Sequence, residues 1–221
     1  MGAGQLADIF SGLSILAAAV YGFALLTKPV SGPRTLIKAA AIACIAAVSA
    51  LHEGPGHWLL TTALVFAAAG DAFMAGNPKP WLPFGLAAFL VVHLLYVALF
   101  SRNGLHLAVL VAELPRALVV LIAIVAAVVV LRVLWGQLRR MREAVVIYGV
   151  VILMMTAMAM TLPWTLSSAM IGAILFMTSD IVLAFRLFRG GGPNITADLA
   201  VWWFYWAGQA LIARAFLHGA H

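Results

Sequence analysis

The chain has 221 residues, of which 65% are hydrophobic and 9% are charged, and its formal net charge at pH 7 is +6. A soluble domain of this size does not bury so much apolar surface, so the composition excludes a soluble enzyme and indicates a protein that crosses a membrane several times. The positive charge does not indicate a nucleic-acid-binding protein, because the cations are scattered through short loops between hydrophobic runs.

Apolar runs of about 17–25 residues, separated by proline, glycine or charged residues, predict the membrane helices. We expect an all-α, polytopic membrane helix bundle of about eight transmembrane helices, forming a single integral membrane domain over 1–221. In chain order the predicted helices span 6–26, 35–51, 58–76, 81–100, 107–135, 144–162, 165–188 and 198–217. The fifth run contains Glu113, Pro115 and Arg116, so its first turns are expected to form a separate piece in which Glu113 and Arg116 neutralise each other.

The distribution of cations predicts the orientation of these helices. Of the 13 lysines and arginines, ten fall on the side of the odd-numbered loops and three on the opposite side. Because cytoplasmic loops of membrane proteins carry an excess of lysine and arginine, the odd-numbered loops are expected in the cytoplasm. Both termini are then expected outside, and the protein in the cell membrane.

Two aspartates, Asp71 and Asp180, lie inside hydrophobic runs of a chain that has only seven acidic residues. A carboxylate in hydrocarbon costs about 2.5–3.5 kcal/mol, so such a residue usually faces the protein interior and takes part in chemistry or transport. At 1.5 Å per residue, both are expected roughly 8–12 Å below the cytoplasmic surface. Tyr205 is expected at a similar level, and His93 and Gln209 nearer mid-membrane, so these residues predict one polar site in the cytoplasmic half of the bilayer.

An ordered set of motifs resembles the YhhN-like lysoplasmalogenase family, and the resemblance covers nearly the whole chain. The motifs are Lys28-Pro29, Gly70-Asp71, His93-Leu-Leu-Tyr96, Ser179-Asp180, and Tyr205 with Gln209. The resemblance implies an integral membrane hydrolase that cleaves the vinyl-ether bond of lysoplasmalogens, giving a fatty aldehyde and glycerophosphocholine or glycerophosphoethanolamine. It also implies that Asp71 and Asp180 are the catalytic residues. The segment 101–165 matches in hydrophobicity and carries no motif.

Vinyl ethers are hydrolysed by acid, which explains why two buried carboxyl groups suit this reaction. A proton added to the carbon distal to the oxygen gives an oxocarbenium ion, water adds, and the hemiacetal collapses to an aldehyde and an alcohol. Burial disfavours the charged form of a carboxyl group, and two adjacent carboxyls resist joint ionisation, so such a pair supplies one acid and one carboxylate. Which is which stays open; Asp180 is taken as the acid because Thr178 and Ser179 are its local polar neighbours.

The remaining candidate substrate-binding residues each have a structural alternative. Lys28 would hold the substrate phosphate at the cytoplasmic rim, or is only a topology anchor at the end of the first helix. His93 would relay protons, or only form a hydrogen bond between helices, and Tyr96 shares its face one turn later but could simply pack. Tyr205 and Gln209 are four residues apart and would orient a carboxyl group or a water molecule. Ser179, beside Asp180, is expected in the same site.

The main alternative function is a proton-coupled membrane transporter of a small or lipid substrate, because paired intramembrane acids are also typical of transporters. The lack of proline- or glycine-interrupted helices in matching halves argues against it. A purely structural membrane protein is a third possibility. No metal or other cofactor is expected, because His52 and His57 are five residues apart across Gly-Pro-Gly, whereas a helical zinc-binding pair is four apart. The expected partners are a lysophospholipid substrate and membrane lipids, with no nucleic acid.

Overall fold

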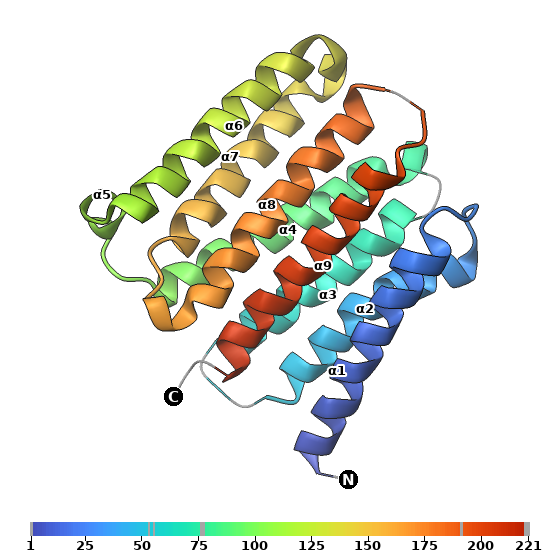
Figure 1. Ribbon diagram of the computed structural model, residues 1–221, viewed down its shortest axis with the longest axis horizontal. Coiled ribbons are helices and arrows are strands. Elements are labelled where there is room, and N and C mark those ends of the chain that lie inside the picture. The colour runs from blue at the N-terminus through green and yellow to red at the C-terminus, as the bar shows by residue number, and fades with distance from the viewer. Residues whose placement is uncertain (1, 53, 55, 76–77, 191, 219–221) are drawn as a thin grey trace. The chain divides into compact units, whose positions relative to one another are not determined.

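The computed structural model describes residues 2–52, 54, 56–75, 78–190 and 192–218, and within these residues the chain is helical and has no strand. The helices are shown in Figure 1. In chain order they are α1 (Ala3–Ala19), a π-helical continuation η1 (Val20–Leu25), α2 (Gly32–Ala50), α3 (His57–Ala75), α4 (Pro78–Asn103), α5 (Val109–Ala112), α6 (Leu114–Leu138), η2 (Arg139–Met141), α7 (Arg142–Ala159), η3 (Trp164–Leu166), α8 (Ser167–Phe188) and α9 (Ile195–His218).

The prediction of an all-α fold with about eight membrane helices is confirmed, because one long helix corresponds to each predicted run. The expected break in the fifth run is also present: the short helix α5 ends at Ala112, and α6 begins beyond Glu113 with Pro115 in its first turn. Proline is favoured in the first turn of a helix, because a backbone N–H group at that position would have no intrahelical partner and its loss costs nothing. Residue 76, the expected end of the third helix, lies outside the described residues.

Six segments of the described chain are long and apolar enough to cross a membrane. They comprise α1 with η1, then α2, α3, α4, the 46-residue segment Leu114–Ala159 and α8 together with η3. The 46-residue segment contains both α6 and α7, so these six segments hold seven of the long helices. The protein is therefore a multi-pass membrane protein. Among the long described helices, α9 falls outside this set; it carries the polar residues Asp198, Gln209 and Arg214.

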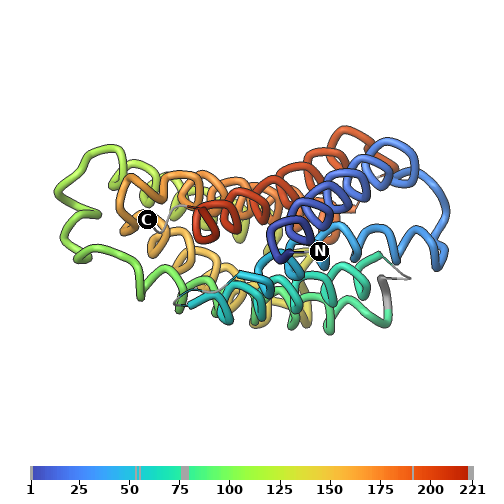
Figure 2. The backbone as a smooth tube through the Cα atoms, turned by 90° about the horizontal axis from the view of Figure 1, so that it is seen from below, coloured from blue at the N-terminus to red at the C-terminus, as the bar shows by residue number. Residues whose placement is uncertain are grey.

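The chain divides into two compact units, and the first comprises Met1–Leu99 with Phe216–His221. In this unit α2 packs against both α1 and α3, and the three helices run side by side in the traces of Figures 1 and 2. Small and aliphatic side chains such as Ala41, Ile42 and Leu64 are fully buried in this core. α4 packs closely on α3 at Gly70, where a Cβ atom would lie 3.0 Å from the ring of Phe89.

The second unit comprises Phe100–Ala215, and in it α7 packs against α6 and α8. Its core contains Ala123, Ile152 and Met177, one from each of these helices. α8 and α9 come together at two glycines, because a Cβ atom on Gly172 would lie 2.7 Å from the carbonyl oxygen of Gly208. Small residues allow membrane helices to pack with their backbones in close contact.

We expect Gly172→Ala to lower the free energy of unfolding by roughly 1–3 kcal/mol, because the added methyl group forces the α8 and α9 backbones apart. Gly149→Ala in α7 is the matched control, since its Cβ atom would meet no atom within 4 Å. Unfolding in mixed micelles at increasing denaturing detergent measures both variants. Equal losses in the two variants would show that the contact between α8 and α9 is not the cause.

Candidate functional site

In the first unit, Asp71 forms a buried ion pair with Lys38. The aspartate lies in the last two turns of α3, and its side chain is 1% exposed. The Nζ atom of Lys38, on α2, is 2.8 Å from Oδ1 of Asp71, and the lysine side chain is 16% exposed. Burying a charge without a partner is far more costly than burying it within an ion pair. The ion pair therefore explains how a carboxylate is accommodated among the apolar residues of α3.

Arg34, one turn before Lys38 on α2, connects three helices about one turn away from this ion pair. Its Nε donates to the carbonyl oxygen of Leu25 at 3.1 Å, and its Nη1 donates to that of Ala75 at 3.0 Å. These carbonyls end η1 and α3, where the last turn of a helix leaves them without intrahelical partners. Nη2 donates to the hydroxyl oxygen of Tyr21 at 3.3 Å, and the Tyr21 ring lies 5.5 Å from the guanidinium and 5.9 Å from Nζ of Lys38.

His93 and Tyr96, on α4 of the same unit, are both fully buried. The Nδ1 atom of His93 lies 2.6 Å from the carbonyl oxygen of Phe89, one turn earlier. Since a carbonyl only accepts, Nδ1 carries the hydrogen in the neutral ring, and Nε2 is then the basic nitrogen. Because Phe89 packs on Gly70, α4 is held directly against the part of α3 that carries the buried carboxylate. The functional roles of His93 and Tyr96 stay predictions.

In the second unit, Asp180 pairs with a tyrosine. Asp180 lies on α8 and is half-buried, and the hydroxyl group of Tyr148, on α7, donates to its Oδ2 at 3.1 Å. Tyr148 is held in place because it packs, together with Ile181, against the core cluster of this unit. The two aspartates therefore have different partners: an ammonium group for Asp71 and a phenol for Asp180.

Two other predicted residues of the second unit, Ser179 and Tyr205, lie at the contact between α8 and α9. The hydroxyl of Ser179 donates to the carbonyl oxygen of Val201 at 2.8 Å, so it joins the two helices. The ring of Tyr205 lies edge-on to Phe176, with centroids 5.4 Å apart, and Gln209 is fully buried one turn later. Their burial is compatible with a polar site inside the protein, and their binding of substrate stays a prediction.

The partners of the two aspartates, Lys38 and Tyr148, were not predicted from the sequence. Lys38 is one of the ten cations that predict the orientation of the helices, and no other role was predicted for it. It nevertheless lies within a predicted membrane helix, where a lysine is itself a signal of function. Tyr148 lies in the segment that carried no motif. Lys28, the predicted phosphate-binding residue, is exposed in the turn after η1. The lysine that contacts Asp71 is Lys38.

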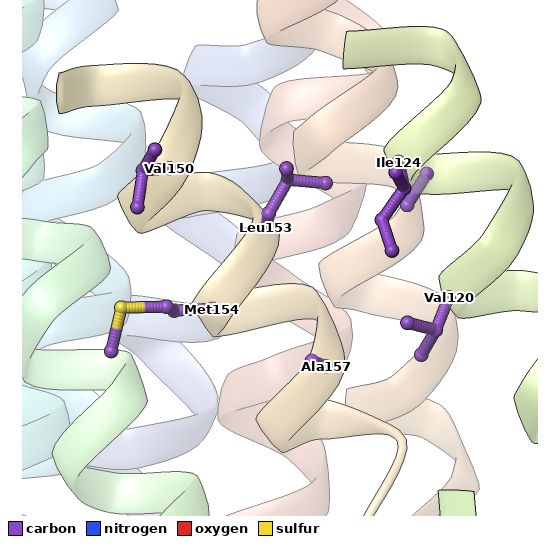
Figure 3. Close-up of a pocket in the computed structure, with 7 residues that line it drawn as sticks. Val120, Ile124, Val150, Leu153, Met154 and Ala157 are labelled. Atoms are coloured by element: carbon purple, nitrogen blue, oxygen red, sulfur yellow. The ribbon is translucent and has the colours of Figure 1, made fainter. Parts of the chain in front are cut away.

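A pocket of about 280 Å³ lies between α6 and α7, and its walls are apolar (Figure 3). It is lined by Val120, Ala123, Ile124, Val150, Leu153, Met154 and Ala157. None of these side chains can transfer a proton or carry a charge, so this pocket is not a site of acid–base chemistry. Its apolar walls suit contact with hydrocarbon chains.

The fold and these contacts define the class: a polytopic membrane protein whose apolar helices carry one carboxyl group beside an ammonium and another beside a phenol. The model of the YhhN family matches residues 33–216, and the chain belongs to this family. It is 30% identical over 190 residues to "Lysoplasmalogenase" of Mycobacterium bovis, covering 82% of this chain and 69% of that protein. It is 31% identical over 188 residues to "Lysoplasmalogenase TMEM86B" of Homo sapiens, covering 82% and 74%. No solved structure matches it.

Proposed function

We propose that the protein is a lysoplasmalogenase, an alkenyl ether hydrolase that acts on lysoplasmalogens in the membrane. The observation that carries the proposal is the 30–31% identity to proteins named lysoplasmalogenase across 82% of the chain. The expected products are a fatty aldehyde and glycerophosphocholine or glycerophosphoethanolamine. The presence of carboxyl groups in membrane helices supports it, because this reaction needs a proton donor and an anion but no cofactor.

In the proposed mechanism, Asp71 and Asp180 divide these two roles. One carboxyl group gives its proton to the vinyl carbon distal to the ether oxygen, and the other, as a carboxylate, stabilises the oxocarbenium ion. The carboxylate then takes a proton from the water that adds to the cation. In the last step it returns this proton to the leaving oxygen, while the first carboxyl recovers its proton from the hemiacetal hydroxyl. Both groups end as they began, so the cycle needs only water.

The residues proposed to bind and orient the substrate are those of the family motifs: Lys28, His93, Tyr96, Ser179, Tyr205 and Gln209. The packing of α4, which carries His93 and Tyr96, on α3 at Gly70 supports this assignment, because Gly70 is next to the proposed catalytic residue Asp71. The basic Nε2 of His93 suits a relay of protons between water and a carboxyl group.

Aldehyde release by the purified protein in detergent tests the function. We expect lysoplasmenylcholine to release aldehyde, and the matched lipid with a saturated ether chain to release none. The double bond is essential because it provides the carbon that accepts the proton. A lysophospholipid with an ester bond controls for a different hydrolase. Release of no aldehyde from any vinyl-ether lipid would contradict the proposal and favour the proton-coupled transporter.

We also propose that the protein lies in the cell membrane with both termini outside and the aspartates toward the cytoplasmic half. The excess of cations on the odd-numbered loops supports this orientation. Two cysteine variants in a Cys44→Ser background test this orientation, because Val30 and Thr165 are both exposed. We expect the cysteine of Val30→Cys to react with a membrane-impermeant maleimide only after cell lysis. The cysteine of Thr165→Cys is expected to react in intact cells. The reverse labelling pattern would overturn the orientation.

A further inference from the structure

Four arginines gather in the second unit where α6 turns into α7 (Figure 1). Arg132 lies in the last two turns of α6, Arg139 and Arg140 are in η2, and Arg142 begins α7. All four side chains are exposed, and Glu143 is the one acidic residue in the segment 132–143. Four positive charges against one negative charge give this turn a surface that attracts a negatively charged partner.

Two of these arginines lie beside an exposed tryptophan, Trp135. The guanidinium of Arg142 is 5.1 Å from the centre of the Trp135 ring, and its Nε donates to the carbonyl oxygen of Trp135 at 3.1 Å. Arg132, one turn before Trp135 on α6, lines the same groove as this ring. The hydrogen bond to the carbonyl uses only Nε of Arg142. Its two Nη groups therefore remain to make the bidentate contact that a guanidinium forms with a phosphate.

The groove beside Trp135 becomes apolar toward the middle of α6. Its volume is about 550 Å³, and Val128 and Leu131 line it together with Arg132 and Trp135. α6 belongs to a segment that is long and apolar enough to cross a membrane, so exposed aliphatic side chains such as Val128 meet hydrocarbon there. A cationic end that continues into an apolar wall matches the two parts of a phospholipid, a charged head group and an acyl chain.

We propose that this groove is a binding site for an anionic phospholipid of the membrane. Its phosphate contacts Arg132 and Arg142 beside the Trp135 ring, and one acyl chain lies along Val128 and Leu131. The proposed orientation puts the turn between α6 and α7 in the cytoplasm, and the cytoplasmic leaflet is the one that carries anionic lipids. Lysoplasmenylcholine has no net charge, so the lipid bound here is distinct from the proposed substrate. The site lies wholly within the second unit and does not depend on the proposed reaction.

Quenching of tryptophan fluorescence in the purified protein tests this site. A phospholipid with brominated acyl chains quenches a tryptophan that it contacts. The contribution of Trp135, one of seven tryptophans, is the difference between the wild-type protein and Trp135→Phe. In mixed micelles we expect brominated phosphatidylglycerol to quench this contribution at about ten-fold lower mole fraction than brominated phosphatidylcholine. Equal quenching by the two lipids would show only the contact that any membrane surface makes, and would overturn the proposal.

Variants of the two arginines test which charges select the lipid. Arg132→Gln and Arg142→Gln are each expected to raise the mole fraction of phosphatidylglycerol required by about five-fold, the usual effect of one cation near a membrane surface. Arg142→Lys keeps the charge but not the planar group, so a smaller loss is expected. Arg189→Gln is the matched control, because Arg189 is an exposed cation that follows α8 in the same unit. An equal loss in Arg189→Gln would show that net charge, and not this groove, selects the lipid.

Inorganic phosphate separates a lipid site from a site for a free anion. We expect phosphate to relieve the quenching no more than sodium chloride does at the same ionic strength, since both salts screen exposed charges. Stronger relief by phosphate would overturn the assignment to a lipid. Thermal unfolding in detergent without phospholipid checks the fold, and each variant should unfold at the wild-type temperature because these side chains are exposed. If Arg142→Gln unfolds at a lower temperature, Arg132→Gln alone decides the test.

Discussion

Asp71→Asn and Asp180→Asn are each expected to lower kcat/KM for vinyl-ether hydrolysis by about 10²- to 10⁴-fold, the usual contribution of general acid–base catalysis. Asparagine has almost the same shape as aspartate, but it neither donates an acidic proton nor carries a negative charge. Either substitution therefore removes one of the two roles in the proposed mechanism. Aldehyde release at several substrate concentrations gives kcat and KM separately, and we expect the loss mainly in kcat.

A loss of activity carries weight only if the variants are folded. Asp71→Asn removes the charge that pairs with the ammonium of Lys38, which destabilises a buried site. The double variant with Lys38→Met removes both charges, so we expect it to fold and to remain inactive. Asp8→Asn, at an exposed position of α1, is the control and should keep the wild-type rate. Activity within a few-fold of wild type in folded Asp71→Asn or Asp180→Asn would contradict the mechanism.

The positions of the membrane helices are predictable from the sequence because hydrocarbon thickness sets their length. The first and last residues of the helices are less predictable, as α2 shows. The apolar run predicted a start at residue 35, whereas α2 begins at Gly32. The Ser31 side chain caps the helix by accepting from the backbone N–H of Arg34, and Pro33 occupies the first turn. Capping residues extend a helix beyond its apolar part, so hydropathy alone underestimates its length.

The candidate site was predictable only in part. Asp71 and Asp180 are evident in the sequence because a carboxylate within an apolar run is costly wherever the helix packs. Their partners are a different matter, since Tyr148 is 32 residues from Asp180 in the chain and on another helix. Lys38 likewise reaches Asp71 only because α2 packs on α3. Which faces of two helices meet is decided by tertiary packing, and the local pattern of one sequence does not encode it.

The second unit also contains a buried cation, Arg116. Among the substitutions considered, its removal has the largest expected effect on the free energy of unfolding. The side chain of Arg116 is 1% exposed, and its Nε lies 2.9 Å from the carboxylate of Glu113. Its Nη1 donates to the carbonyl oxygens of Met160 and Leu162, which follow the end of α7. The Trp164 ring lies 4.5 Å from the guanidinium, and its indole N–H donates to Glu113 at 3.1 Å. Arg116 therefore fastens the start of α6 to the end of α7.

We expect Arg116→Met to lower the free energy of unfolding by about 3 kcal/mol, because it leaves two buried carbonyl oxygens and a carboxylate without this donor. The value is at the low end for a broken buried ion pair, since Glu113 is itself 37% exposed and keeps contact with water. Arg116→Lys retains the charge but not the planar group that reaches several acceptors, so an intermediate loss is expected. Arg132→Met, exposed on the same helix, is the matched control. Unfolding in mixed micelles measures all three, and equal stability of Arg116→Met and Arg132→Met would show that α6 and α7 are joined without this arginine.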